Sequence, residues 1–360
     1  MKRIAEIDVA RCAMNYMIVL MHAGACYKYV ETNTMEWYIV RTFGSFVMNL
    51  AMPAFYILSG YLLFKGLTAG TFGVKIMNRI RRLLIPFLAW NALFVVVYLA
   101  AAPFVPHIAL RVEMFELTTL SGVLSKFFNF TMTPIDGPLW FIRDIFVYSL
   151  FALPMLWIMR RGNWRLIIAV MFVWCVIDGY MDACRWTGSL LDSWHLTSYV
   201  IGALIAVHGK DLIHFFKPRV YLFVGMIALA LFTIWKLPYA VDWGHQYPAW
   251  QLVMFKFTTV LYGPVLLCVV SWIPSGRISE WPLFKWLNKM AFFAYAGHFL
   301  FCSVLLHSFA AKFPGITHGS GGVTILYLVF FVGGVVLMSG VYWLGLRLMP
   351  RVTKLFDGTL

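Results

Sequence analysis

Long apolar stretches separated by short polar segments run along almost the whole chain of 360 residues. Such stretches predict membrane-spanning helices, because about 20 consecutive apolar residues match the hydrocarbon thickness of a bilayer. The pattern predicts an all-α polytopic bundle of about ten transmembrane helices, in one domain covering residues 1–360. The expected spans are residues 9–28, 41–64, 83–102, 138–159, 165–180, 194–208, 219–237, 250–272, 290–310 and 322–347.

The charged residues give these spans an orientation. Most of the 29 lysine and arginine residues fall on one side of the predicted membrane, together with both ends of the chain. This is the positive-inside pattern, so both termini are expected in the cytoplasm. The net charge of +14 follows from this topology, and no basic tail or aromatic stacking platform points to a nucleic-acid partner. A composition of 62% hydrophobic and 12% charged residues excludes a soluble domain.

The first predicted span carries a polar stripe. Asp8, Arg11, Asn15 and His22 are spaced so that an α-helix brings them to one face. A charge at bilayer depth costs at least about 2.5 to 3.5 kcal/mol, so such a stripe is expected only along a cavity, a transport pathway or a reaction site. At about 1.5 Å per residue, Arg11 lies near the cytoplasmic end of the span and His22 about 20 Å into it.

Polar residues also mark the second and fourth spans. Arg41 is expected at the outer end of the second span, as a contact for an acidic or phosphorylated acceptor or as an interfacial anchor. In the fourth span, Trp140 is a candidate substrate contact or an aromatic-belt residue. Arg143 and Asp144 follow it, and two adjacent charges at that depth require partners in a cavity. A helix directs them about 100° apart.

Five segments, in this order along the chain, carry a resemblance to a known family. They are Arg11 with His22 after ten intervening residues, AFYILSGYLLFKG at 54–66, RIRRLLIP at 79–86, GPLWFIRDIFVY at 137–148 and AYAGHFLF at 294–301. Together they resemble the membrane-bound acyltransferase family 3, over nearly the whole chain. A single-domain type is expected, without the extracytoplasmic hydrolase-like domain of longer members. The opening IDVARCA departs from the family pattern.

The resemblance implies transfer of an acyl group, usually acetyl, from a cytoplasmic acyl-coenzyme A to a hydroxyl or amine of an envelope acceptor. His22 is then expected to be the general base, since an imidazole can accept the hydroxyl proton near neutral pH; a structural role in hydrogen bonding is the alternative. Asp144 is expected at the same membrane depth and would orient His22. His298, one turn after Tyr295, matches the family's tyrosine and histidine segment and is a further substrate contact, or a structural histidine.

Coenzyme A carries phosphates that suit arginine side chains. Arg79 and Arg82, in the family's basic segment, and Arg11 are therefore expected to bind it, although loop arginines also arise from topology alone. Arg11 is also assigned to the catalytic residues, with His22 and Asp144. Ser59, beside Gly60, would let the pantetheine arm approach, or would serve helix packing. Asn15 and Arg143 are assigned to substrate contacts. The histidines do not show the spacing typical of metal ligands, and no bound metal is expected.

The expected partners are acyl-coenzyme A, membrane lipid and an acceptor that is a glycan, a lipid-linked sugar or peptidoglycan, in a bacterial inner membrane. A secondary transporter is the alternative function, with Asp8, Arg11, His22 and Asp144 as a proton or substrate relay. Inverted repeats with paired broken helices would favour that alternative, and the sequence shows neither. A lipid-binding scaffold without activity is a third possibility.

Overall fold

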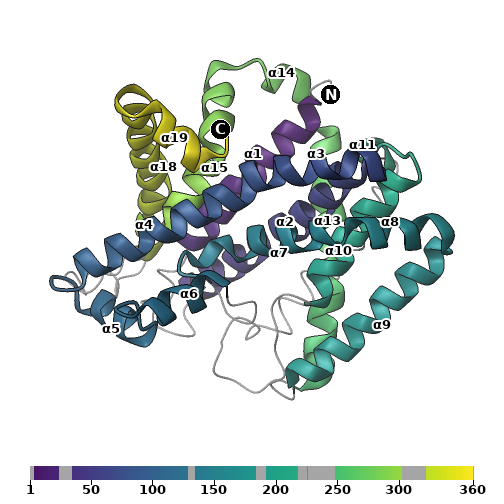
Figure 1. Ribbon diagram of the computed structural model, residues 1–360, viewed down its shortest axis with the longest axis horizontal. Helices are drawn as coiled ribbons and strands as arrows, with labels where there is room; N and C mark the ends of the chain where they lie inside the picture. Colours follow the sequence, from purple (N-terminus) through teal and green to yellow (C-terminus); the bar gives the residue numbers. More distant parts are fainter. Residues whose placement is uncertain are drawn as a thin grey trace. The chain divides into compact units, whose positions relative to one another are not determined.

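The computed structural model describes residues 4–23, 35–128, 134–183, 192–217, 225, 248–301 and 322–359. Within these ranges every regular element is helical, which confirms the predicted all-α class (Figure 1). The elements are α1 (Ala5–Ala23), α2 (Met35–Phe64), α3 (Ala69–Arg79), the π-helical turn η2 (Ile80–Leu84), α4 (Ile85–Ala101), α5 (Pro106–Met114), α6 (Leu120–Phe128), the short helical turn η3 (Gly137–Leu139), α7 (Trp140–Leu150), α8 (Ala152–Arg161), α9 (Trp164–Ala183), α10 (Ser193–Val207), α11 (Leu212–Phe216), α13 (Ala249–Trp272), α14 (Ser275–Ile278), α15 (Pro282–Phe301), α18 (Gly322–Leu348) and α19 (Pro350–Asp357).

Several of these helices suit a membrane. Among the described residues, four helical stretches are long and apolar enough to cross one, namely Ala69–Ala101, Trp164–Asp182, Ala249–Trp272 and Tyr327–Leu348. The bent pair of α7 and α8 would make a fifth. The helices are thus compatible with a membrane bundle, while the count of about ten and the cytoplasmic termini stay predictions. Apart from residue 225, the expected span 219–237 lies outside the described residues.

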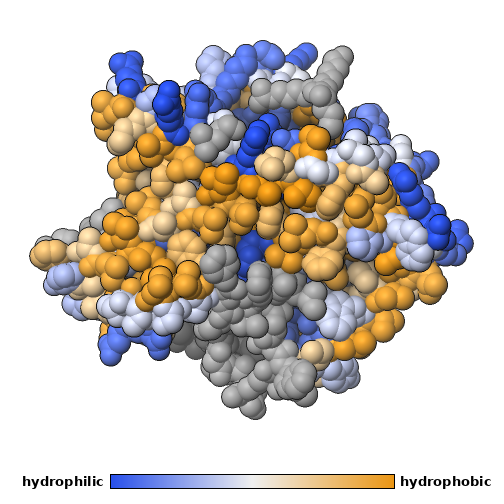
Figure 2. Space-filling view, in the orientation of Figure 1, coloured by the Kyte–Doolittle hydropathy of each residue, from blue (hydrophilic) through white to orange (hydrophobic). Residues whose placement is uncertain are grey.

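Apolar side chains cover the outside of the long helices. On α18, Leu328, Val332 and Val336 each expose more than half of their surface. Figure 2 shows orange, apolar residues over α18 and along α4. Groups of exposed apolar side chains are unfavourable in water but suit lipid tails, so these helix faces match the expected contact with lipid.

The fourth predicted span, 138–159, is not a straight helix. It consists of α7 and α8, which meet at a bend of 63°. Pro154 explains the break, because it has no N–H to donate to the carbonyl of Leu150 and its ring crowds that carbonyl. The fourth predicted span is therefore a broken helix, and its crossing of the membrane stays a prediction.

The third predicted span begins earlier than residue 83. Its helix starts at Ala69 and runs through η2 into α4. Thr68 caps the start of this helix. The Thr68 hydroxyl accepts a hydrogen bond from the Thr71 N–H (3.2 Å), and the Thr71 hydroxyl accepts one from the Thr68 N–H (2.9 Å). The π-helical turn η2 carries Arg81 and Arg82, and such turns are frequent at functional sites.

The chain divides into two compact units. Unit 1 comprises residues 1–18, 45–76 and 147–288, and unit 2 comprises residues 19–44, 77–146 and 289–360. In unit 1, α2 packs closely on α10 and α13. A Cβ added to Gly60 would collide with the carbonyl of Tyr199, and one added to Gly202 with that of Ile57. Small residues permit this backbone contact, as in other membrane helix pairs. The space beside Gly60 is thus occupied by the backbone of α10 and not by a substrate arm.

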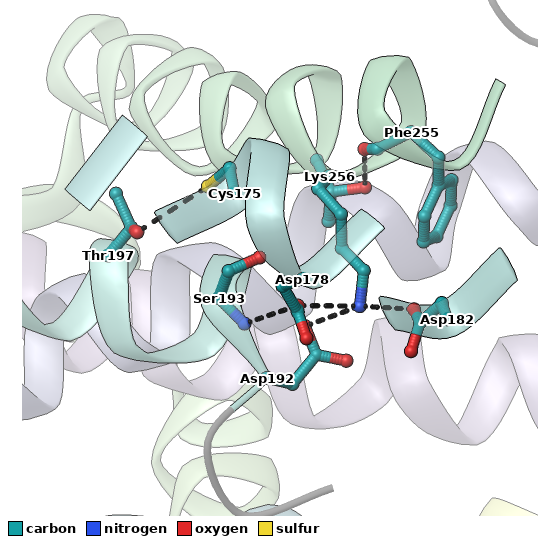
Figure 3. Close-up of polar contacts among 9 residues, drawn as sticks. Cys175, Asp178, Asp182, Asp192, Ser193, Thr197, Phe255 and Lys256 are labelled. Atoms are coloured by element: carbon teal, nitrogen blue, oxygen red, sulfur yellow. Dashed lines mark hydrogen bonds and ion pairs between the residues drawn. The ribbon is translucent and has the colours of Figure 1, made fainter. Parts of the chain in front are cut away.

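A buried charge network joins α9, α13 and the start of α10 in unit 1. The ammonium of Lys256, 3% exposed, lies 3.0 Å from Asp178, 2.7 Å from Asp182 and 2.9 Å from Asp192 (Figure 3). Asp178 also accepts a hydrogen bond from the Ser193 N–H (2.9 Å). Sequence reasoning missed this network, although Asp178 and Asp182 at a spacing of four on an apolar helix were a signal for it.

Candidate active site

Two histidines from opposite ends of the chain meet in unit 2. The ring centre of His22, on α1, lies 4.8 Å from that of His298, on α15, with 52° between the ring planes. The ring of Phe299 lies 5.8 Å from that of His22 and forms an edge-to-face contact with it. Both histidines were candidates from the sequence, but their pairing was not foreseen.

Tyr295 fixes the orientation of His298. The Nδ1–H of His298 donates to the backbone carbonyl of Tyr295, one turn earlier on α15. The Tyr295 hydroxyl donates to the carbonyl of Pro138, just before α7. Because Nδ1 carries the proton, Nε2 of His298 is left with a lone pair. This Nε2 is buried and has no hydrogen-bond partner within the described part of the chain. The site therefore holds a hydrogen-bond acceptor beside His22.

Phe299 also links the histidine pair to a cation in the predicted outer loop. The guanidinium carbon of Arg111, on α5, lies 5.8 Å from the centre of the Phe299 ring. Arg111 makes a long hydrogen bond to the Tyr98 hydroxyl (3.4 Å). Sequence reasoning missed Arg111, because a single charge in a loop gives no signal of what it faces.

Asp136 is a second residue that the sequence did not single out. It precedes η3, its side chain is buried, and its backbone N–H donates to the Asn91 Oδ1 at 3.0 Å. The Asn91 amide in turn donates to the carbonyl of Phe87 (2.7 Å). Burial raises the pKa of the Asp136 carboxyl well above its usual range.

Arg143 and Asp144 form a buried ion pair. The Nη2 and Nε of Arg143 lie 2.9 and 3.0 Å from the Asp144 Oδ1. Arg143 is 6% exposed and Asp144 is fully buried. The expectation that Arg143 points away from Asp144 is wrong, because its long side chain bends back to the next residue. The predicted action of Asp144 on His22 stays a prediction.

Of the expected substrate contacts Trp140 and Arg41, the structure describes the side chain of Trp140 alone. Trp140 is the first residue of α7, is partly exposed and makes an edge-to-face contact with Phe141. Arg41 falls in α2, in the part of that helix whose side chains lie outside the described residues.

The other polar residues of α1 belong to unit 1. Arg11 and Asp8 form an ion pair of 3.6 Å, and the side chain of Arg11 is 49% exposed. The Asn15 amide donates to the carbonyl of Arg11 (3.0 Å). The helical spacing predicted for Asp8, Arg11 and Asn15 is thus confirmed, since α1 is a continuous helix.

The residues expected to bind coenzyme A are divided between the units. Arg79 and Arg82 lie on either side of the start of η2 in unit 2, and Ser59 lies in α2 in unit 1. Arg79 is half-buried and reaches the carbonyl of Ile145 (3.5 Å), whereas Arg82 is exposed. No group of three or more histidine, cysteine or acidic residues in the described ranges could hold a metal ion.

The described residues thus combine apolar helices compatible with a membrane and a contact between the buried His298 and the partly exposed His22. A family profile described as "Acyltransferase domain" matches residues 4–344, and the chain belongs to this acyltransferase family. The chain is also similar to the "Succinoglycan biosynthesis protein ExoH" of Rhizobium meliloti (strain 1021), with 22% identity over 292 residues, 78% of this chain and 72% of that protein. No solved structure matches the chain. The family resemblance seen in the sequence is confirmed.

Proposed function

We propose that this protein transfers an acyl group, with acetyl as the first candidate, from a cytoplasmic acyl-coenzyme A to a hydroxyl of a cell-envelope carbohydrate. Membership of the acyltransferase family supports the reaction class. The relative named for succinoglycan biosynthesis supports a polysaccharide-related acceptor. The protein would work as a multi-pass enzyme of the bacterial inner membrane, with the coenzyme on the inner side and the acceptor glycan, lipid-linked sugar or peptidoglycan on the outer side.

The observation that carries the mechanism is the contact of His22 with His298 at 4.8 Å. His22 takes the proton from the acceptor hydroxyl while the hydroxyl oxygen attacks the thioester carbonyl carbon. The tetrahedral intermediate then collapses and the carbon–sulfur bond breaks. The departing thiolate takes the proton from His22, which gives free coenzyme A and neutral His22. Two imidazolium ions at this separation would repel each other, so the pair favours the single proton that this cycle needs.

The basic residues of the inner side would hold the coenzyme. Arg82 is exposed and Arg79 half-buried at the start of η2, and the side chain of Arg11 in unit 1 is 49% exposed. Guanidinium groups make paired, charge-assisted hydrogen bonds with phosphate oxygens. Ser59 would lie along the pantetheine arm, and Trp140, Arg143, Arg41 and Asn15 along the acceptor.

Asp144 would orient His22 and stabilise its protonated form. The ion pair with Arg143 uses one of the two carboxylate oxygens of Asp144, Oδ1. A carboxylate can accept further hydrogen bonds, so this ion pair and an orienting role are compatible.

The test is transfer of radiolabel from acetyl-coenzyme A to an envelope glycan fraction extracted from cells that lack the gene. Membranes that contain the protein should label this fraction, and membranes with His22→Gln should not. Label that stays in acetyl-coenzyme A with the wild-type protein would reject the proposal.

A further inference from the structure

Asp136 has a buried carboxyl group that nothing in the described part of the chain pairs. The residue is 0% exposed, and neither Oδ1 nor Oδ2 has a hydrogen-bond partner there. Burying a polar group without a hydrogen-bond partner is unfavourable, because the group loses its hydrogen bonds to water. Native proteins satisfy nearly all such groups, so a carboxyl left in this state points to a ligand that completes it.

The local backbone does not need this carboxyl. An aspartate before a helical turn normally caps it by accepting from the second or third N–H. Here the second residue is Pro138, which has no N–H, and the third N–H, of Leu139, bonds the backbone carbonyl of Asp136 (3.0 Å). No side-chain capping bond forms at η3. The position of the backbone is set instead by Asn91, through the Asp136 N–H.

Tyr295 connects the segment of Asp136 to His298. Its hydroxyl reaches the carbonyl of Pro138, two residues after Asp136. The Tyr295 hydroxyl proton is committed to the carbonyl of Pro138, and the Tyr295 carbonyl accepts from His298. Tyr295 therefore satisfies neither the carboxyl of Asp136 nor the Nε2 of His298. The ring centres of Tyr295 and His298 are 6.0 Å apart, so the backbone segment after Asp136 and the ring of His298 both lie against one tyrosine in unit 2.

Hydroxyl groups can bond to both residues. The Nε2 of His298 is an acceptor, and a carboxyl group offers acceptor oxygens and, when protonated, one O–H donor. A ligand that satisfies Nε2 must donate a hydrogen bond, and hydroxyl groups can donate to one partner and accept from another. We propose that Asp136 and His298 form the wall of the acceptor site that binds hydroxyl groups, beside His22, and that the acceptor is a carbohydrate with neighbouring hydroxyls. This inference rests on the proposed acyl transfer.

The decisive variants are Asp136→Leu and Asp136→Asn. Leucine removes the unpartnered polar group, so thermal stability in detergent should stay equal or rise. The concentration of the extracted glycan fraction that gives half-maximal labelling should rise at least about tenfold, the effect of losing one hydrogen bond to a ligand. Asparagine keeps a donor and an acceptor, so half-saturation should stay within about threefold of wild type. Acetyl-coenzyme A affinity should be unchanged in both variants.

Asp357 is the matched control, because its buried carboxyl is satisfied by the Tyr342 hydroxyl (2.8 Å). Asp357→Leu should lose thermal stability and keep its half-saturation. The inference is overturned if Asp136→Leu keeps wild-type half-saturation, if it loses stability as Asp357→Leu does, or if Asp136→Asn is impaired as strongly as Asp136→Leu. These results leave acyl transfer standing. Absence of any labelling by the wild-type protein would instead overturn both the function and this inference.

Discussion

The imidazole of His22 lies against that of His298, with the ring centres 4.8 Å apart. One residue is near the start of the chain and the other near its end, and each belongs to a different family-like segment. Their contact makes these two segments parts of one site. Because the Tyr295 carbonyl holds the Nδ1–H of His298, the Nε2 lone pair is fixed in place beside the proposed base.

Replacing both Arg79 and Arg82 by glutamine should weaken acetyl-coenzyme A binding by about 3 kcal/mol, or more than a hundredfold, because charge-assisted hydrogen bonds to phosphate are lost. Calorimetry in detergent measures this, and the wild-type affinity should fall as salt increases. Arg81→Gln, an exposed change in the same turn, is the control and should have little effect. Unchanged affinity in the double variant would remove the two arginines from the coenzyme site.

Asp144→Asn should reduce both stability and activity. It removes the negative charge that the buried guanidinium of Arg143 contacts, and breaking such a pair costs about 3 to 5 kcal/mol. A second change, Arg143→Gln, should restore stability, as thermal unfolding in detergent would show. If Asp144 orients His22, the stable double variant should still turn over at least about a hundredfold more slowly than wild type at saturating acceptor, where loss of the proposed Arg143 contact to the acceptor should have little effect. Recovery of activity together with stability would mean that Asp144 serves the ion pair alone.

Lys256→Met should lower the thermal unfolding temperature strongly. It leaves Asp178, Asp182 and Asp192 facing one another without the ammonium, and losing one partner of a buried pair costs about 3 to 5 kcal/mol. Lys285→Met is the control, because the Lys285–Glu280 pair is exposed and should contribute little. Equal unfolding temperatures for the two variants would contradict a stabilising role of the Lys256 network.

Reporter fusions test the topology. The positive-inside pattern predicts that tags at residue 2, within 66–78 and at the C-terminus report the cytoplasm, and that a tag within 103–130 reports the outer side. Protease protection in intact spheroplasts gives the readout. A C-terminal tag cleaved from the outside would overturn the predicted arrangement of about ten spans.

The sequence predicted the helical class well, because a period of 3.6 and long apolar runs are local properties. The bend between α7 and α8 was also within reach, since Pro154 falls inside the apolar run. The contact between Arg143 and Asp144 could not be predicted in this way. Helical geometry gives the direction in which a side chain leaves the backbone, but it does not give the position of the end of a long, flexible side chain such as that of arginine.

The site was predictable residue by residue but not as an arrangement. His22 and His298 were each recognised, yet depth along the membrane is one coordinate and does not tell which spans are neighbours. Which spans become neighbours depends on packing contacts such as those of Gly60 and Gly202. Asp136 was missed because aspartate followed by glycine and proline is typical of a turn, and its burial arises only when Asn91, Tyr295 and Pro138 come together.

Mass spectrometry of the envelope polysaccharide tests the central claim most directly. Cells that lack the gene are supplied with the wild-type protein, with His22→Gln, or with the control His208→Gln, which changes an exposed histidine at the end of α10. Wild type and His208→Gln should restore the added mass of an acyl group on the polysaccharide. His22→Gln should not, although it is present in the membrane and binds acetyl-coenzyme A. Full acylation by His22→Gln would contradict the role of His22 as the general base.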